Sequence, residues 1–118
     1  MKKILVAEDN DSNFILMTYI LRKYYSYDRA KNGQEAVDLV ANGGYDMVLM
    51  DIKMPVMDGL EATKVIKEKH PDLPIIALTA NAFDSDRQLA VQAGCSDFLS
   101  KPVSSELCIK TIRKFLGE

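Results

Sequence analysis

The chain has 118 residues, 47% of them hydrophobic and 27% charged, which is the composition of one ordinary globular domain. Its 15 Lys and Arg against 17 Asp and Glu give a net charge of −2, without the basic excess that generic nucleic-acid binding needs. No apolar run approaches the roughly 18 residues of a membrane helix or serves as a signal-peptide core, so we expect a cytoplasmic protein that contacts neither membrane nor nucleic acid directly.

Metal-binding cysteine and histidine motifs are missing from the sequence. A zinc site needs about four nitrogen or sulfur ligands at regular spacing, whereas the chain has only Cys95, Cys108 and His70. Because nothing indicates secretion, we expect two buried or half-buried thiols and no disulfide.

Short apolar runs alternate along the chain with segments of helical periodicity. The runs are nearly continuous, which is typical of strands covered on both faces. They span residues 4–7, 27–30, 47–50, 75–78 and 98–99, and the half-polar run 27–30 is expected at a sheet edge.

Helix start signals precede each intervening segment. The helices are expected to begin near Asp11 or Ser12, after Asn32-Gly33, at Asp58, at Asp84 or Ser85, and at Ser104 or Ser105. Apolar stripes mark the first and the last helix, and consist of Phe14, Met17, Leu21 and Tyr24, and of Leu107, Ile112, Phe115 and Leu116.

The resulting order is strand then helix, repeated five times. Such alternation predicts an α/β fold, a parallel sheet with helices on both faces joined by right-handed crossovers. No internal repeat, low-complexity stretch or linker interrupts the pattern, so residues 1–118 are expected to form a single domain.

Chemically distinctive side chains leave these strands at one predicted edge of the sheet. Glu8 and Asp9 follow the first run, Asp51 the third, Thr79 the fourth and Lys101 the fifth. Ligands of open α/β sheets bind at this edge, where the strand order switches. Clustered carboxylates repel one another unless a cation joins them, and Mg²⁺ suits a site that meets a phosphoryl group. Together, acids, metal, lysine and hydroxyl predict a site for the charge of a phosphoryl group in transfer, at which a carboxylate can itself be the nucleophile.

Each of these residues is also an ordinary feature when it stands alone. Acidic residues after strands are often solvated or cap a helix, and a lysine at a strand end is most often a surface residue. Only their joint position, each at a strand end on one edge, favours the chemical interpretation.

The surrounding motifs resemble the receiver domain of response regulators in two-component signalling. They are ILVAEDN at 4–10, LMDIKMPVMDG at 49–59, ALTA at 77–80 and FLSKP at 98–102, and the resemblance runs from Lys3 to about Leu116. The strings at 10–13 and 78–82 are most similar to receivers of hybrid histidine kinases. The resemblance implies a flavodoxin-like (βα)5 sandwich with strand order 2-1-3-4-5.

The resemblance also implies a role for each site residue. Asp51 would accept a phosphoryl group from a histidine kinase or histidine phosphotransfer domain. Mg²⁺ would be held by Asp9 directly, by Glu8 through water, by Asp51 and by the backbone carbonyl of Lys53. Lys101 would pair with one phosphoryl oxygen.

The resemblance also implies a change in the surface formed by the fourth helix, the fifth strand and the fifth helix. Thr79 would bond a further phosphoryl oxygen, Phe98 would fill the space that Thr79 vacates, and the surface would then regulate an effector protein or an attached domain. The small Ala80 would leave the site open, Lys53 and Asn81 would flank it where family members tune the phosphoryl lifetime, and Lys101-Pro102 would be cis.

Two departures from the family pattern stand out. Phe98 lacks the hydroxyl of the more usual Tyr, so its switching would depend on packing alone. The segment 24–27, Tyr-Tyr-Ser-Tyr, replaces a glycine-containing turn, which leaves the start of the second strand open.

Three alternative functions are weighed against this interpretation. A haloacid-dehalogenase-like phosphatase would place a second Asp two positions after the nucleophile, where this chain has Lys53. A flavodoxin-like FMN binder would need a hydroxyl- and glycine-rich loop where Glu8-Asp9 stands, and would be yellow. A pseudo-receiver that never accepts phosphate would not require the complete acidic set.

Overall fold

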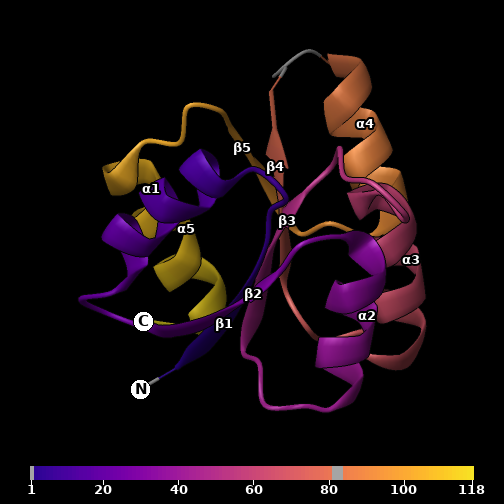
Figure 1. Ribbon diagram of the computed structural model, residues 1–118, viewed down its shortest axis with the longest axis horizontal. Helices are drawn as coiled ribbons and strands as arrows, with labels where there is room; N and C mark the ends of the chain where they lie inside the picture. The colour runs from indigo at the N-terminus through magenta and orange to yellow at the C-terminus, as the bar shows by residue number, and fades with distance from the viewer. Residues whose placement is uncertain (1, 81–83) are drawn as a thin grey trace.

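A parallel sheet forms the centre of the computed structural model, which describes residues 2–80 and 84–118, the latter with side chains from 86 onward (Figure 1). Its described strands are ordered β2-β1-β3-β4-β5, as predicted. They are β1 (Lys3–Ala7), β2 (Ser26–Ala30), β3 (Met47–Asp51), β4 (Ile75–Thr79) and β5 (Asp97–Ser100).

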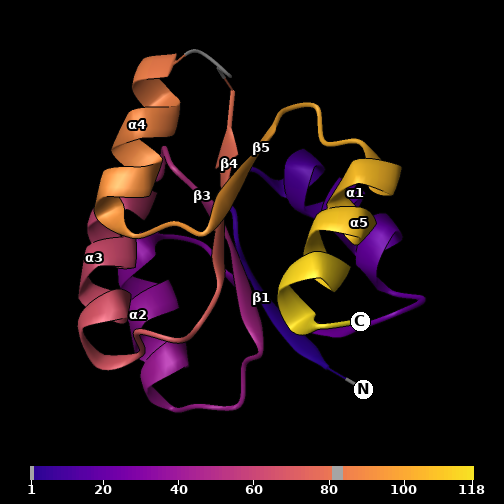
Figure 2. The ribbon, with the colours of Figure 1, turned by 180° about the vertical axis from the view of Figure 1, so that it is seen from behind.

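Helices cover both faces of the sheet. They are α1 (Asp11–Leu21), α2 (Gly33–Ala41), α3 (Gly59–Lys69), α4 (Asp84–Ala93) and α5 (Ser105–Leu116). Figures 1 and 2 show α1 and α5 on one face and α2, α3 and α4 on the other. The predicted doubly wound α/β fold is therefore confirmed. Among the described residues, no helix combines the length and the apolar character needed to cross a bilayer.

Successive residues of the central strands alternate between two separate cores. Ile4 and Val6 of β1 pack in the cluster that holds Met17 of α1 and Ile112 of α5. Leu5 and Ala7 pack in the opposite cluster with residues of α2, α3 and α4. Strands buried on both faces read as continuous apolar runs, which is why β1, β3 and β4 were predictable from sequence.

Side-chain caps fix the starts of four helices. Asn10, Asn32, Asp58 and Ser104 each accept a hydrogen bond from the backbone N–H three residues later. Such caps satisfy amide groups that the first helical turn leaves without a partner. Because α1 and α3 are the next elements after the site-bearing strands β1 and β3, their caps also fix where the connecting loops end.

Two residues assigned to apolar stripes are exposed instead. Helix α1 ends at Leu21, so Tyr24 lies in the following turn and is 49% exposed, while Tyr25 is buried and donates its hydroxyl hydrogen to Glu118. Leu107 is 51% exposed because it lies one residue, or about 100° of helical rotation, before the buried Cys108. Both predictions were wrong at the edge of a stripe that is otherwise correct.

A glycine in tight contact closes the loop after β3. The Gly59 N–H donates to the carbonyl of Ile52 at 2.8 Å, and a Cβ at this position would collide with the carbonyl oxygen of Asp51. Only glycine permits so close a backbone approach. The start of α3 is thereby held against the end of β3, where the predicted nucleophile lies.

Candidate functional site

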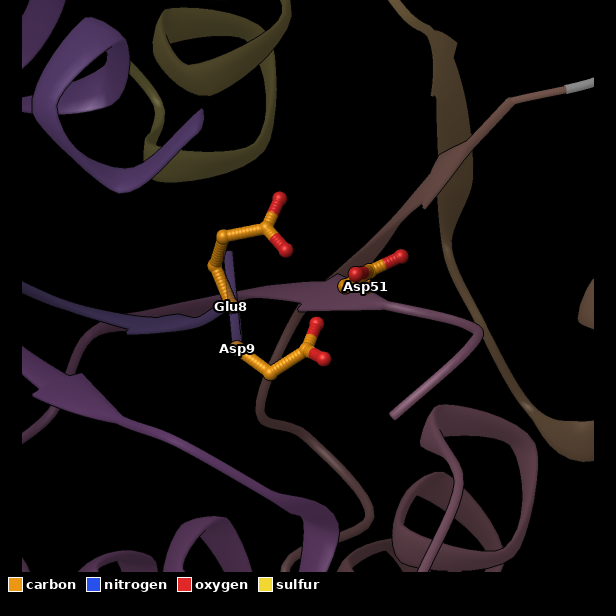
Figure 3. A group of neighbouring side chains, drawn as sticks. All are labelled: Glu8, Asp9 and Asp51. Atoms are coloured by element: carbon orange, nitrogen blue, oxygen red, sulfur yellow. The ribbon is translucent and has the colours of Figure 1, made fainter. Parts of the chain in front are cut away.

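Three carboxylates converge beyond the carboxyl ends of β1 and β3. In Figure 3 the side chains of Glu8, Asp9 and Asp51 point into a common space. One oxygen atom from each lies within 4.8 Å of the other two. Glu8 is 1% and Asp51 5% exposed, whereas Asp9 is exposed at the rim. The predicted convergence is therefore present, with two of the three acids buried.

A cavity of about 250 Å³ opens onto these carboxylates. Its lining comes from the ends of β1, β3 and β4 and the residues that follow them, from the residue after β5, and from α1 and α4. The lining residues are Glu8, Asp9, Asn10, Asn13, Asp51, Ile52, Lys53, Leu78, Thr79, Ala80, Asp86 and Lys101. This is the sheet edge at which open α/β folds bind ligands.

Lys101 connects the two buried acids. Its Nζ lies 2.8 Å from Oε1 of Glu8 and 3.2 Å from Oδ2 of Asp51. Its backbone N–H donates to the carbonyl of Thr79 at 2.7 Å, and the peptide bond to Pro102 is cis. The loop between β5 and α5 thus places one positively charged side chain, Lys101, beside two carboxylates.

Burial and the neighbouring acid raise the pKa of Asp51 to about 7. Desolvation is the largest cause, followed by the hydrogen bond and the charge of Glu8, and Lys101 opposes them only in part. Burial also raises the pKa of Glu8, but hydrogen bonds with Asp51 and Lys101 outweigh it and lower that pKa overall. The pKa of Lys101 is raised, because both acids outweigh the effect of its burial. One lysine therefore does not neutralise this site.

This residual negative charge fits a divalent cation. Carboxylate oxygens are the ligands that Mg²⁺ prefers, and the exposed Asp9 adds a third carboxylate within reach of the buried pair. A bound cation would take the place of the proton that the raised pKa of Asp51 retains near neutral pH. The donor chemistry of the site is thus that of an acidic metal-binding cluster.

The remaining predicted residues differ in whether they line the cavity. Thr79 is buried and its hydroxyl donates to Oδ2 of Asp86 at 3.4 Å. The Lys53 N–H donates to Oδ1 of Asp51 at 3.4 Å, while the Lys53 side chain is exposed. Phe98 is half-buried, outside the cavity lining, with the guanidinium of Arg87 4.6 Å from its ring centroid. Asn81 lies outside the described residues.

Sequence reasoning missed two residues that contact the site. Asp86 lines the cavity, and Arg29 of β2 donates from Nε to the carbonyl of Glu8 at 3.0 Å. Arg29 also pairs with the carboxylate of Asp11 at 2.9 Å. The start of α4 at the same sheet edge was a signal for Asp86, whereas no motif points to Arg29.

The raised pKa of Asp51 predicts an unusual pH dependence of stability. Between about pH 4 and pH 7 the folded chain keeps a proton that the unfolded chain has lost, so the free energy of unfolding falls as pH rises. In metal-free buffer we expect Asp51→Asn to be more stable than wild type by roughly 1–3 kcal/mol at pH 8. The difference should vanish near pH 4.

Urea unfolding followed by circular dichroism at several pH values measures this difference. Asp72→Asn removes an exposed charge from the opposite edge of the sheet and is the matched control. A difference between wild type and Asp51→Asn that is independent of pH would contradict the assignment of the raised pKa to Asp51.

Comparisons with known proteins agree with this geometry. The family model of the response regulator receiver domain matches residues 4–113. Hybrid signal transduction histidine kinase B of Dictyostelium discoideum is 41% identical over 99% of this chain, which spans only 7% of that protein.

Solved structures show the same fold. The receiver domain of sensor histidine kinase PA1611 from Pseudomonas aeruginosa, with magnesium in its active-site cleft, has a TM-score of 0.93 and 36% identity, covering 99% of this chain and 98% of that one. The receiver domain of Ssk1 in complex with the phosphotransfer protein Ypd1 from Saccharomyces cerevisiae has a TM-score of 0.91 and 35% identity, covering 97% and 88%. The chain belongs to the response regulator receiver domain family and acts in phosphorelay signal transduction as a signalling phosphoacceptor rather than a true enzyme.

Proposed function

We propose that Asp51 is the residue that accepts the phosphoryl group. The observation that carries this proposal is its buried carboxylate, which lines the cavity beside Glu8 and lies 3.2 Å from the ammonium of Lys101. Asp51 is the only one of the three clustered acids that ends a central strand, and so its backbone is fixed by the sheet. Its Oδ1 also accepts the N–H of Lys53, which restricts its orientation.

The proposed metal ligands are Asp9, Asp51 and the backbone carbonyl of Lys53, with Glu8 acting through water. Mg²⁺ would supply positive charge to the phosphoryl oxygens when bound. Support comes from the acidic cluster itself and from the magnesium in the cleft of the PA1611 receiver domain.

The transfer step requires little covalent chemistry from the protein. A carboxylate oxygen of Asp51 attacks the phosphorus of a phosphohistidine in line, and the O–P bond forms as the N–P bond breaks. The electron pair of the broken bond stays on the imidazole nitrogen of the donor. Lys101 is placed to hold a phosphoryl oxygen, since its ammonium already lies 3.2 Å from the Asp51 carboxylate.

Phosphorylation would then change the surface formed by α4, β5 and α5. The new group adds charge and acceptor oxygens beside Asp51. Thr79 would turn its hydroxyl toward them, and Phe98, half-buried on β5, would follow into the vacated space. Because Phe98 has no hydroxyl, its change would be one of packing. An effector protein or an attached domain would bind this changed surface.

The proposed donor is a histidine kinase or a histidine phosphotransfer domain in the cytoplasm. The complex of the Ssk1 receiver domain with Ypd1 supports a partner of this kind. We further propose that residues 1–118 act as one receiver domain, consistent with the single sheet and its two cores.

Phosphotransfer profiling tests the proposed function. Each histidine kinase or phosphotransfer domain of the host is labelled on histidine and mixed briefly with this chain and Mg²⁺. We expect the label to move rapidly to the chain from one or a few donors, and to move far more slowly when Mg²⁺ is chelated. Failure of every donor to transfer, under conditions in which a known receiver is labelled, would contradict the proposal.

A further inference from the structure

A hydrogen bond joins the end of β4 to the first turns of α4. The Thr79 hydroxyl donates to Oδ2 of Asp86 at 3.4 Å. Thr79 is buried, and Asp86 is half-buried and lines the same cavity as Asp51 and Lys101. The proposed function uses Thr79 as a phosphoryl ligand but gives Asp86 no part.

The chemistry of a hydroxyl makes this contact consequential. Thr79 carries one hydroxyl proton, so it donates either to Asp86 or to a phosphoryl oxygen on Asp51, and not fully to both. The carboxylate of Asp86 is a charged acceptor, which is a strong competitor for that proton. The described arrangement is therefore one that a phosphoryl group must disrupt.

The next residue of α4 contacts the second side chain expected to move. The guanidinium of Arg87 lies 4.6 Å from the ring centroid of Phe98, a separation typical of a cation–π contact. Consecutive residues of one helix thus hold both Thr79 and Phe98.

We propose that Asp86 is a positioning residue that holds Thr79 in the unphosphorylated arrangement and so opposes occupation of the site by a phosphoryl group. The inference rests on the proposed function, because it requires the group to bind at Asp51. Asp86 acts through Thr79, and its removal should favour the phosphorylated arrangement rather than damage it.

A purely electrostatic effect of Asp86 is the competing explanation. Any carboxylate lining the cavity repels an incoming anion, with or without the contact to Thr79. The two explanations differ in one respect: repulsion persists when the Thr79 hydroxyl is absent, whereas the positioning effect requires it. A double-mutant cycle separates them.

The experiment measures the affinity of the chain for beryllofluoride, a phosphoryl mimic, by calorimetry in saturating Mg²⁺. We expect Asp86→Ala to tighten binding roughly three- to tenfold, and Asp86→Asn, which keeps a weaker neutral acceptor, roughly twofold. In a Thr79→Ala background, Asp86→Ala should change the affinity by less than about 1.5-fold. Asp72→Asn, the remote charge control, should match wild type.

Either of two results would overturn the inference. One is an unchanged or weaker affinity of Asp86→Ala and Asp86→Asn, and the other is equal tightening with and without the Thr79 hydroxyl. Loss of fold would weaken binding, so tighter binding is not an effect of structural damage. If wild type does not bind the mimic, or Asp51→Asn binds it as well, the proposed function fails and this inference with it. If wild type binds through Asp51 and only the cycle fails, the proposed function stands.

Discussion

Replacement of Asp51 by asparagine is expected to abolish uptake of a phosphoryl group from acetyl phosphate in the presence of Mg²⁺. The amide is nearly isosteric with the carboxylate, so the fold is retained, but it lacks the nucleophilic oxygen that becomes esterified. Intact mass spectrometry should show the mass of one added phosphoryl group on wild type and none on Asp51→Asn.

The matched control for this substitution is Asp46→Asn. Asp46 is exposed directly before β3, at the opposite end of the strand that Asp51 ends, where its carboxylate accepts the N–H of Lys3. This variant should be phosphorylated like wild type. Stoichiometric phosphorylation of Asp51→Asn would show that another residue accepts the group.

Replacement of Lys101 by methionine is expected to slow phosphorylation by acetyl phosphate by a factor of roughly 10²–10³. The long apolar side chain preserves much of the packing, while the ammonium beside Glu8 and Asp51 is lost. Without that charge, the developing negative charge on the phosphoryl oxygens loses its protein-derived counterion. Rates are measured by quenched-flow sampling and intact mass.

Two further variants sharpen the test of Lys101. Lys101→Arg keeps a positive charge in a different shape and should recover part of the rate. Lys110→Met removes an exposed lysine from α5, far from the cavity, and should leave the rate unchanged. A rate for Lys101→Met within threefold of wild type, with saturating Mg²⁺, would remove Lys101 from the mechanism.

The sequence predicts the fold and most of the site for a common physical reason. Strands buried on both faces are apolar along their whole length, so the first polar residue after each run marks its carboxyl end. Glu8, Asp51 and Thr79 are recognisable in this way, and the parallel arrangement brings their strand ends to one edge. Lys101 lies one residue beyond the position that this rule marks, directly after Ser100 at the end of the half-buried strand β5.

Features that depend on packing between helices and strands cannot be predicted from the sequence pattern in this way. Helical periodicity places Leu107 on an apolar stripe but does not indicate how far around α5 its neighbours reach. The contact between Thr79 and Asp86 depends on where the first turns of α4 lie relative to β4. The sequence predicts that the clustered carboxylates repel one another, but it does not reveal that burial is the largest cause of the raised pKa of Asp51.

The site residues also disfavour two of the alternative functions. A phosphatase of the haloacid-dehalogenase type would require an acid in place of Lys53, whose side chain is exposed and carries a positive charge. An FMN phosphate would meet the carboxylates of Glu8 and Asp9 at the end of β1. Both features favour a cation and a phosphoryl acceptor at this edge of the sheet.

The most direct test of the account is to locate the phosphoryl group in the wild-type chain. After treatment with acetyl phosphate and Mg²⁺, borohydride reduces an aspartyl phosphate to homoserine, which tandem mass spectrometry of the digested protein places by residue. We predict homoserine at position 51 alone, and at no position when Mg²⁺ is chelated before the donor is added. Homoserine at another aspartate, or a phosphoryl group on a hydroxyl or imidazole side chain, would contradict the claim that this cluster of acids and Lys101 directs phosphorylation to Asp51.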